Sequence, residues 1–267
     1  MEEAKIISIL NNNPHYIKSI NDPTEEMKLL ALKKNGLVLE YIQDPTEEMK
    51  EIAISNNVNA IKYIDNPSEE MMMKAVKSGW NMLNYIEKPT EKVIKLAIDK
   101  SGWAIQYVEN PSEELQLLAV SKNYDSLKFI KRPYESVQEK AIKTSYDALK
   151  YIKEPSMSAE ILAIKDNEAA ITLINDLDQK KILEFLKVNI LVFKYVRNHI
   201  ANGELEELLK DVLSKEEVEE KYVRDFLNCK AISKDDNTIS MDKTMFIYKH
   251  GSKKAKRIAV DEKLKLV

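Results

Sequence analysis

The chain has 267 residues, of which 44% are hydrophobic and 32% are charged, and its formal net charge is −3. Such a chain can bury a core, and its near-balanced charge excludes a general attraction to nucleic acid or to an anionic membrane. A single cysteine, Cys229, excludes an internal disulfide. No apolar segment has the length of a membrane span, and the N-terminus lacks the pattern of a secretory signal, so we expect a cytoplasmic protein, in a bacterial or a host cytosol.

Residues 1–21 are the first segment, which we predict to be an N-terminal capping half-repeat. Their apolar side chains follow helical spacing and are Ile6, Ile9, Leu10, Ile17 and Ile20. The run Asn11-Asn12-Asn13-Pro14 interrupts that pattern. An atypical copy of this kind is expected at the end of a stacked array.

Residues 22–175 contain seven copies of a 22-residue repeat, each opening with a phrase close to Asp-Pro-Thr-Glu-Glu. The prolines of the phrase recur every 22 residues and are Pro23, Pro45, Pro67, Pro89, Pro111, Pro133 and Pro155. A fixed period of this length is typical of stacked-repeat proteins, in which each repeat buries its apolar face against its neighbours. We number positions from the residue before proline, so that repeat 1 runs from Asp22 to Gln43.

The opening phrase predicts the start of an α-helix. Asp or Asn at position 1 is a good N-cap, proline fits the first helical position, and glutamate then falls at the third. The paired glutamates, such as Glu25 and Glu26, lie at the positive end of the helix dipole. As direct neighbours they diverge around the helix, so we interpret them as structural and not as a catalytic acid and base.

The rest of the repeat predicts two short helices joined by a turn. Position 10 is alanine and position 11 is Leu, Ile or Val in every repeat, which indicates close packing along one face of the first helix. Position 14 is Asn, Ser or Gly, as expected for a helix end and a turn. Position 20 of the second, shorter helix is Tyr in five repeats, Phe in one and Leu in one. Because the hydroxyl is dispensable there, we expect these rings to pack in the core.

Two other architectures share the period. Leucine-rich repeats have a similar length, but no repeat here has the Leu-x-Leu strand that they need. Lipid-surface proteins with 22-residue amphipathic helices are a closer alternative, because positions 6, 10, 17 and 21 also line one face of an unbroken helix. The polar or glycine residue at position 14 interrupts that face in each repeat, which favours a stack of αα-hairpins, an α-solenoid.

After the array, residues 176–230 predict a degenerate repeat and further C-terminal helices. Residues 231–267 predict a small β-rich element, because Thr244 to Tyr248 is β-branched and aromatic and because Arg257 to Val260 and Leu264 to Val267 are alternating or apolar. This tail carries a basic run of Lys249, Lys253, Lys254, Lys256 and Arg257. The run is interpreted either as an edge-protecting turn of the β element or as a patch that binds phosphate or an acidic partner.

The sequence contains no catalytic or cofactor motif that we can identify. His15, His199 and His250 have no metal-ligand spacing, and there is no Gly-rich phosphate loop, His-Glu-x-x-His, Cys-x-x-Cys or Gly-x-Ser-x-Gly. A stack of repeats also presents an open surface more readily than a closed pocket. We therefore expect no enzymatic activity, no cofactor and no bound metal.

The repeat resembles an uncharacterised, proline-punctuated helical repeat family of bacterial and phage proteins. The resemblance is carried by Asn66 to Glu70, Ala75 and Leu83-x-Tyr85-Ile86, and by the corresponding Asn110 to Glu114, Ala119 and Leu127-x-Phe129-Ile130. It covers residues 22–175 and implies a scaffold without shared catalytic residues. Through its phage and accessory bacterial members, it also implies an inhibitor or adaptor that acts on a host macromolecule.

Positions 15 and 16, at the turn between the two helices, hold a series of aromatic residues: Trp80, Trp103, Tyr124 and Tyr146. One interpretation is that these rings cover the rim of the neighbouring repeat. The other is that they anchor a partner, since Val58-Asn59 and Glu168-Ala169 at the same positions indicate that the stack does not require a ring.

We therefore predict an all-α protein, an α-solenoid with a small C-terminal α+β element. Its predicted function is that of a non-enzymatic protein-binding scaffold, whose partner is another protein of the host or of a defence system. The alternative function is nucleic-acid binding through the basic tail. We expect no membrane association.

Overall fold

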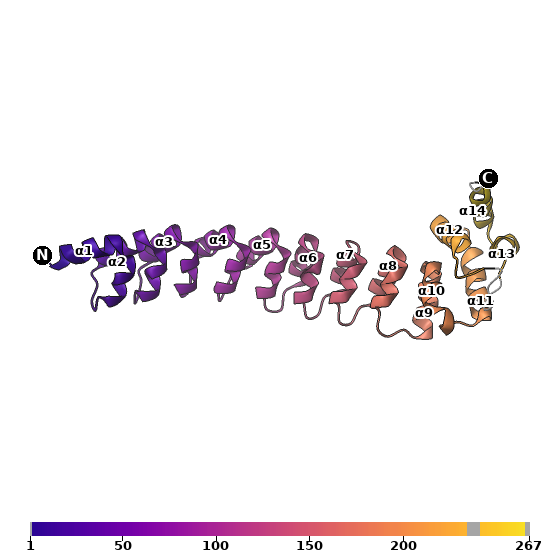
Figure 1. Cartoon of the computed structure of the whole chain (residues 1–267), viewed down its shortest axis with the longest axis horizontal. Helices are drawn as coiled ribbons and strands as arrows, with labels where there is room; N and C mark the ends of the chain where they lie inside the picture. Colours follow the sequence, from indigo (N-terminus) through magenta and orange to yellow (C-terminus); the bar gives the residue numbers. More distant parts are fainter. Residues whose placement is uncertain (1, 234–240, 265–267) are drawn as a thin grey trace. The chain divides into compact units, whose positions relative to one another are not determined.

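The structure is a computed structural model that describes residues 2–233 and 241–264, and over these residues it is built from helices without a β-strand (Figure 1). The α-helices are α1 (Glu2–Asn12), α2 (Glu25–Lys34), α3 (Glu47–Asn56), α4 (Glu69–Ser78), α5 (Glu91–Lys100), α6 (Glu113–Lys122), α7 (Glu135–Ile142), α8 (Met157–Asp166), α9 (Gln179–Val188), α10 (Phe193–Val196), α11 (Asn202–Leu213), α12 (Glu220–Asn228), α13 (Lys243–His250) and α14 (Lys253–Leu264).

Short 3-10 helices alternate with the α-helices of the array. They are η1 (Pro14–Ser19), η2 (Gly36–Tyr41), η3 (Val58–Tyr63), η4 (Trp80–Tyr85), η5 (Gly102–Tyr107), η6 (Tyr124–Phe129), η7 (Tyr146–Tyr151), η8 (Glu168–Leu173), η9 (Ile190–Val192) and η10 (Arg197–His199). Each repeat is thus an α-helix followed by a 3-10 helix. The predicted all-α solenoid of short helical hairpins is confirmed, and the second helix of each hairpin is of the 3-10 type.

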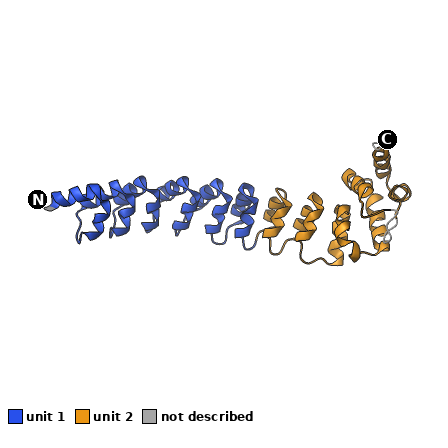
Figure 2. Ribbon diagram, viewed as in Figure 1, with its two compact units in different colours: residues 1–132 blue, residues 133–267 orange. Residues whose placement is uncertain are grey.

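The chain divides into two compact units, residues 1–132 (unit 1) and residues 133–267 (unit 2) (Figure 2). Unit 1 contains α1 to α6 with η1 to η6, and unit 2 contains the remaining elements. Within unit 1, successive α-helices pack on one another and successive 3-10 helices do the same, as in α2 with α3 and η2 with η3. The repeats therefore form two layers that share one core.

The helix caps differ from the sequence prediction. In six of the seven repeats the N-cap is the Thr or Ser at position 3, whose hydroxyl oxygen accepts a hydrogen bond from the third N–H of the helix, as Thr24 does from Met27. Proline thus precedes the cap and disfavours helical geometry in the residue before it. Asp44, Asn66 and Asn110 at position 1 instead have positive φ, between 47° and 51°, a conformation that Asp and Asn tolerate better than most residues. In these three repeats the position-1 residue therefore adopts the left-handed conformation of the turn between repeats and does not cap the helix.

Position 14 closes one helix and opens the next, as predicted. In repeat 1 the Asn35 N–H donates to the Ala31 carbonyl at the end of α2, while its Oδ1 accepts from Leu37 N–H at the start of η2. Asn57, Ser101, Ser145 and Asn167 make the same pair of contacts. Because each repeat is broken here, it does not have the unbroken helix that the lipid-surface alternative requires.

The core follows the repeat positions. The position-10 alanines are fully buried in all seven repeats, from Ala31 to Ala163, and positions 17 and 18 of each 3-10 helix are buried beneath them. A small side chain at position 10 lets adjacent α-helices approach closely. In α9, which follows the last repeat, Phe185 occupies the corresponding place and is also fully buried.

The predicted β element of the tail is wrong over the residues that the structure describes. Thr244 to Tyr248 lies in α13, which begins after an Asp242 N-cap and ends at Gly251. Arg257 to Val260 lies in α14, where Ala255, Ile258 and Ala259 are buried at helical spacing. The predicted strand from Leu264 to Val267 falls outside the described residues from 265 onward. The prediction relied on the β-branched and aromatic residues of this segment. The Asp242 N-cap and the helical spacing of the buried residues in α14 instead favour helices.

Among residues 2–233 and 241–264, none of the helices combines the length and the apolar character needed to cross a bilayer.

Candidate functional site

The outer side of the 3-10 layer in unit 1 carries a row of aromatic rings. The last residue of each 3-10 helix from η2 to η6, at position 20, contributes one ring: Tyr41, Tyr63, Tyr85, Tyr107 and Phe129. We call these five rings, with Trp80 and Trp103, the aromatic face. Tyr41 is 38% exposed and Tyr85 is 45% exposed, and the other three position-20 rings are half-buried.

The expectation that the position-20 tyrosines are core residues is therefore wrong. The core is filled by positions 17, 18 and 21, represented in repeat 1 by Val38, Leu39 and Ile42, all buried. Position 20 ends the 3-10 helix, one turn after position 17, where a ring can cover the helix end and keep one edge in solvent. Such a placement suits a side chain with an apolar body and a polar tip.

Trp80 and Trp103 join the row by contacts between repeats. The Trp80 ring, at the start of η4, stacks on Tyr107 of the next repeat with centroids 6.1 Å apart. The Trp103 indole Nε1 donates to Asp125 Oδ1 of the next repeat at 2.8 Å, and Trp103 remains 38% exposed. Both predicted roles, rim cover and exposed anchor, are compatible with these positions.

The other two predicted anchors lie apart from these contacts. Tyr124 is half-buried at the start of η6 in unit 1, and Tyr146 is half-buried at the start of η7 in unit 2. Tyr151, the position-20 residue of η7, is 37% exposed. Sequence reasoning therefore missed the position-20 rings as surface residues, although their strict recurrence was visible.

Polar side chains fill the spaces between the rings. Positions 16 and 19 of repeats 2 to 4 are exposed, and four of their six residues are amides, namely Asn59, Asn81, Asn84 and Gln106. Charged groups of this face contact the rings themselves: the Lys62 Nζ lies 4.6 Å from the Tyr63 centroid, and Lys128 lies 4.7 Å from that of Trp103. The spaces between the rings thus hold amides in repeats 3 and 4, and they hold charged groups, Glu40, Lys62, Asp125 and Lys128, in the repeats on either side.

The hydroxyl groups on this face are poor candidates for chemistry. The Tyr63 hydroxyl donates to Glu40 Oε2 at 3.1 Å. The nearby charge of Glu40 raises the pKa of Tyr41, and a hydrogen bond that Lys62 donates to Tyr63 raises the pKa of Lys62. Both shifts favour the protonated state, so neither group is prepared as a base or a nucleophile.

The basic run of the tail lies on helices. Lys249 is in α13, and Lys253, Lys254, Lys256 and Arg257 are in the first two turns of α14. The Glu216 carboxylate accepts from the backbone N–H groups of Lys253 and Lys254 at 3.1 and 3.4 Å, so a protein carboxylate already occupies the positive end of α14. Lys256 lies 5.9 Å from the ring of Tyr248, which is 69% exposed.

The histidines and the cysteine do not meet. His15 lies 3.0 Å from the Asn35 amide and packs on Tyr41, whereas His250 packs on Phe246. Cys229 is buried, and burial raises the pKa of its thiol. In the part of the chain that the structure describes, no three His, Cys, Asp or Glu side chains are grouped to hold a metal ion.

Comparisons of the chain with protein-family models, with curated proteins and with solved structures gave no match.

Proposed function

We propose that the protein is a non-enzymatic binding scaffold and that unit 1 binds another protein through the aromatic face. The observation that carries the proposal is the recurrence of a partly exposed ring at position 20, whereas the aliphatic residues at positions 10, 11 and 18 are buried in all seven repeats. A recurring ring that does not fill the core needs another reason to recur. Ligand contact is such a reason.

The composition of the face supports a protein partner. Protein interfaces are enriched in Tyr, Trp and Phe and depleted of Lys, Glu and Asp at their centre. Binding surfaces built from Tyr and Asn combine rigid anchors with adaptable hydrogen bonding. The middle of the aromatic face has this character, since Tyr85 and Tyr107 lie among Asn81, Asn84 and Gln106.

The variation between repeats supports selectivity for one partner. Position 20 is nearly constant, whereas position 16 changes from Leu37 to Asn59, Asn81, Trp103 and Asp125. A constant ring supplies contact area in each repeat, and a variable neighbour makes each repeat different. The resemblance to phage and accessory bacterial proteins points to an inhibitor or an adaptor as the form that this binding takes.

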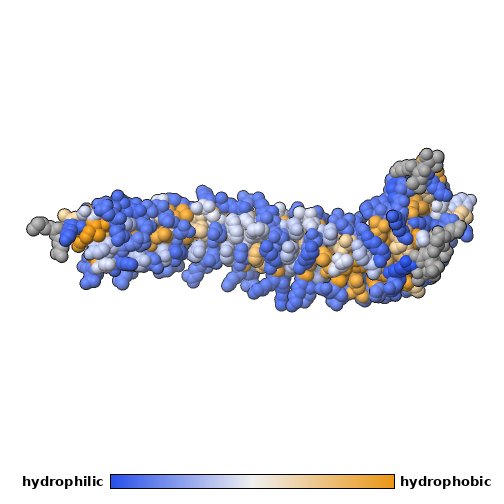
Figure 3. Space-filling view, in the orientation of Figure 1, coloured by the Kyte–Doolittle hydropathy of each residue, from blue (hydrophilic) through white to orange (hydrophobic). Residues whose placement is uncertain are grey.

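Figure 3 gives the surface context. Hydrophilic side chains dominate the face in view, and apolar side chains gather there only in limited patches. On the aromatic face, Tyr and Trp offer a partner anchors that combine an apolar body with a polar tip.

Affinity purification with and without nuclease tests the proposal. The tagged full-length chain is compared with a Tyr41→Ser/Tyr85→Ser variant and with a Tyr134→Ser control, because Tyr134 is 51% exposed but lies outside the aromatic face. We expect the same proteins to co-purify with wild type and control, independently of nuclease, and to be lost with the double variant.

Two results would contradict the proposal. Retention of every co-purifying protein by the double variant would show that binding occurs elsewhere. Loss of the co-purifying material after nuclease treatment would favour nucleic-acid binding, for which the exposed cations Lys249, Lys253, Lys256 and Arg257 are the candidates.

A further inference from the structure

Helices α13 and α14 of unit 2 carry an exposed surface that shares no residue with the aromatic face. Five exposed side chains of α14 recur at helical spacing and so lie on one side of the helix: Lys253, Lys256, Arg257, Val260 and Leu264. Tyr248 of α13 continues this surface, because the Lys256 Nζ lies 5.9 Å from the centroid of its ring. We call these six side chains the tail face.

The tail face is held in place by α12. On the opposite side of α14, three side chains are buried: Ala255, Ile258 and Ala259. Glu262, on the same inner side, pairs with Arg224 of α12. In α13, the Phe246 ring packs on Phe226 of α12 with centroids 6.1 Å apart. Both helices are therefore packed through their inner sides, and their outer residues are available to a ligand.

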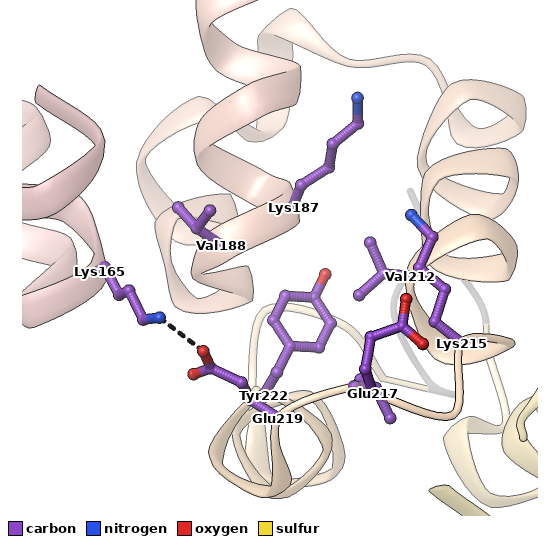
Figure 4. Close-up of a pocket in the computed structure, with 9 residues that line it drawn as sticks. Lys165, Lys187, Val188, Val212, Lys215, Glu217, Glu219 and Tyr222 are labelled. Carbon is purple, nitrogen blue, oxygen red and sulfur yellow. Dashed lines mark hydrogen bonds and ion pairs between the residues drawn. The ribbon is translucent and has the colours of Figure 1, made fainter. Parts of the chain in front are cut away.

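The cations of the tail face differ from most others of unit 2 in having no carboxylate partner. Lysines elsewhere in the unit lie beside protein carboxylates, as Figure 4 shows for Lys165 and Glu219, whose charged atoms are 2.5 Å apart. Lys253, Lys256 and Arg257 have no carboxylate within ion-pair distance among residues 2–233 and 241–264. Their charge is therefore not neutralised by the described part of the protein.

The acidic residues near these two helices do not lie on the tail face. Glu216 accepts hydrogen bonds from backbone N–H groups at the start of α14, and Asp242 accepts one from Met245 N–H at the start of α13. Asp261 is exposed, but as the direct neighbour of Val260 it is turned about 100° around the helix from it. The tail face thus carries three cations and no anion.

The tail face also exposes apolar side chains. Tyr248 and Leu264 are each 69% exposed and Val260 is 58% exposed, and no other large apolar side chain among the described residues is as exposed as these. Along α14, the cations occupy the first two turns and the aliphatic side chains the last two. This combination fits a ligand that carries both negative charge and apolar groups.

We propose that the tail face binds an acidic segment of another protein, whose carboxylates contact the three cations and whose apolar side chains contact the three apolar residues. A nucleic acid would match only the cations, because its phosphates recur along its whole length. Helices that lie on a membrane have an apolar side opposite a basic side, whereas the apolar side of α14 is already buried. With 12 residues α14 is about 18 Å long, so a helical segment of about two heptads covers it.

Fluorescence anisotropy of the full-length protein with a labelled peptide tests the proposal. The probe consists of two heptads of Glu-Leu-Glu-Glu-Leu-Leu-Glu, which place leucines on one side of a helix between glutamates. One comparator has Lys in place of every Glu, and the other has Ser in place of every Leu. We expect saturable binding of the probe below about 1 mM and at least about tenfold weaker binding of each comparator, because each lacks one of the two kinds of contact.

Variants of the protein locate the site. Lys253→Gln/Lys256→Gln/Arg257→Gln should weaken binding of the probe at least about tenfold, because three exposed ion pairs of ordinary strength are lost. Val260→Ser/Leu264→Ser should weaken it at least about threefold through the loss of apolar contact. All five side chains are exposed, so circular dichroism spectra and melting temperatures should match wild type.

Two control variants should bind the probe as wild type does. Lys140→Gln/Lys143→Gln/Lys153→Gln removes three exposed cations of unit 2 that lie outside the tail face, so it matches the change in net charge. Tyr41→Ser/Tyr85→Ser changes the aromatic face alone, so it separates the outcome of this proposal from that of the proposed function.

The proposal is overturned by the absence of saturable binding, by equal binding of the probe and either comparator, or by an equal loss in the control that removes three cations. A single-stranded oligonucleotide and phosphatidylserine vesicles are measured in the same way. If either binds wild type more tightly than the probe does, and this binding is lost in the variant without the three tail-face cations, the tail face is a nucleic-acid or a membrane site instead.

Discussion

Glu160 gives the sharpest test of the packing between repeats. It occupies position 7, where the two preceding repeats have Gln116 and Gln138, and its side chain is 2% exposed. The Gln138 amide donates to the Pro133 carbonyl at 3.1 Å and accepts from Ser156 N–H at 2.9 Å. Glu160 instead receives one hydrogen bond at Oε1, from Lys181 Nζ at 2.8 Å, and its Oε2 is buried without a partner.

Removing the cation should therefore cost far more than removing the anion. Lys181→Met leaves the buried carboxylate unpaired, which we expect to destabilise unit 2 by about 3–5 kcal/mol. Glu160→Gln should change stability by less than about 1 kcal/mol, because the amide can bond as Gln116 and Gln138 do and because Lys181, 25% exposed, can be hydrated. The double variant Glu160→Gln/Lys181→Met should recover most of the loss.

Urea denaturation followed by circular dichroism at pH 7 measures the three variants against wild type. Lys210→Met, which breaks an exposed pair within α11, is the control and should have little effect. The reasoning is refuted if Lys181→Met is no less stable than Glu160→Gln, or if the double variant is no more stable than Lys181→Met alone.

Three further substitutions are chosen by comparing a residue with those at the same position in the other repeats. Ser126→Ala should stabilise by about 1 kcal/mol in thermal melts, because the buried Ser126 hydroxyl has no partner and four other repeats have a buried alanine at this position; a loss of stability would contradict this. Tyr134→Thr should stabilise the protein by about 1 kcal/mol, because Thr or Ser caps the first α-helix of the other repeats and the Tyr134 side chain makes no capping hydrogen bond to α7. An unchanged urea denaturation midpoint would contradict this prediction. Ala97→Leu should destabilise by about 1–3 kcal/mol in urea, because position 10 is fully buried at a close helix contact; tolerance of leucine there would mean that the helices can separate.

The sequence predicts the architecture of the array well because the period is carried by several independent positions. The prolines, the position-10 alanines and the polar residue at position 14 each recur every 22 residues, and all three lead to the same helix boundaries. The exact cap was harder to predict. Asp22-Pro23 and Thr24-Glu25 are both helix-start signals, two residues apart, and only the effect of proline on the residue before it favours the later one.

The repeat pattern does not distinguish an α-helix from a 3-10 helix for the second helix of each repeat. This distinction decides whether the position-20 rings are buried or exposed. Six residues such as Gly36–Tyr41 fit either an α-helix or a 3-10 helix. Taken as α-helical, position 20 joins the core, whereas in the 3-10 helix Tyr41 and Tyr85 reach the surface. In the tail, the prediction of strands was based on the β-branched and aromatic residues 244–248 and was wrong. The helix signals there were the Asp242 N-cap and the helical spacing of Ala255, Ile258 and Ala259.

The affinity of an identified partner for a Trp80→Ala/Trp103→Ala variant tests the proposed binding face most directly. If the two rings are anchors, each substitution should weaken binding by about 2 kcal/mol, measured by calorimetric titration. The melting temperature should fall less than for loss of a core aromatic, which costs about 3–5 kcal/mol, because Trp103 is 38% exposed and Trp80 is half-buried. Unchanged affinity in a folded double variant, or unfolding of that variant, would contradict the assignment of these rings to a binding surface.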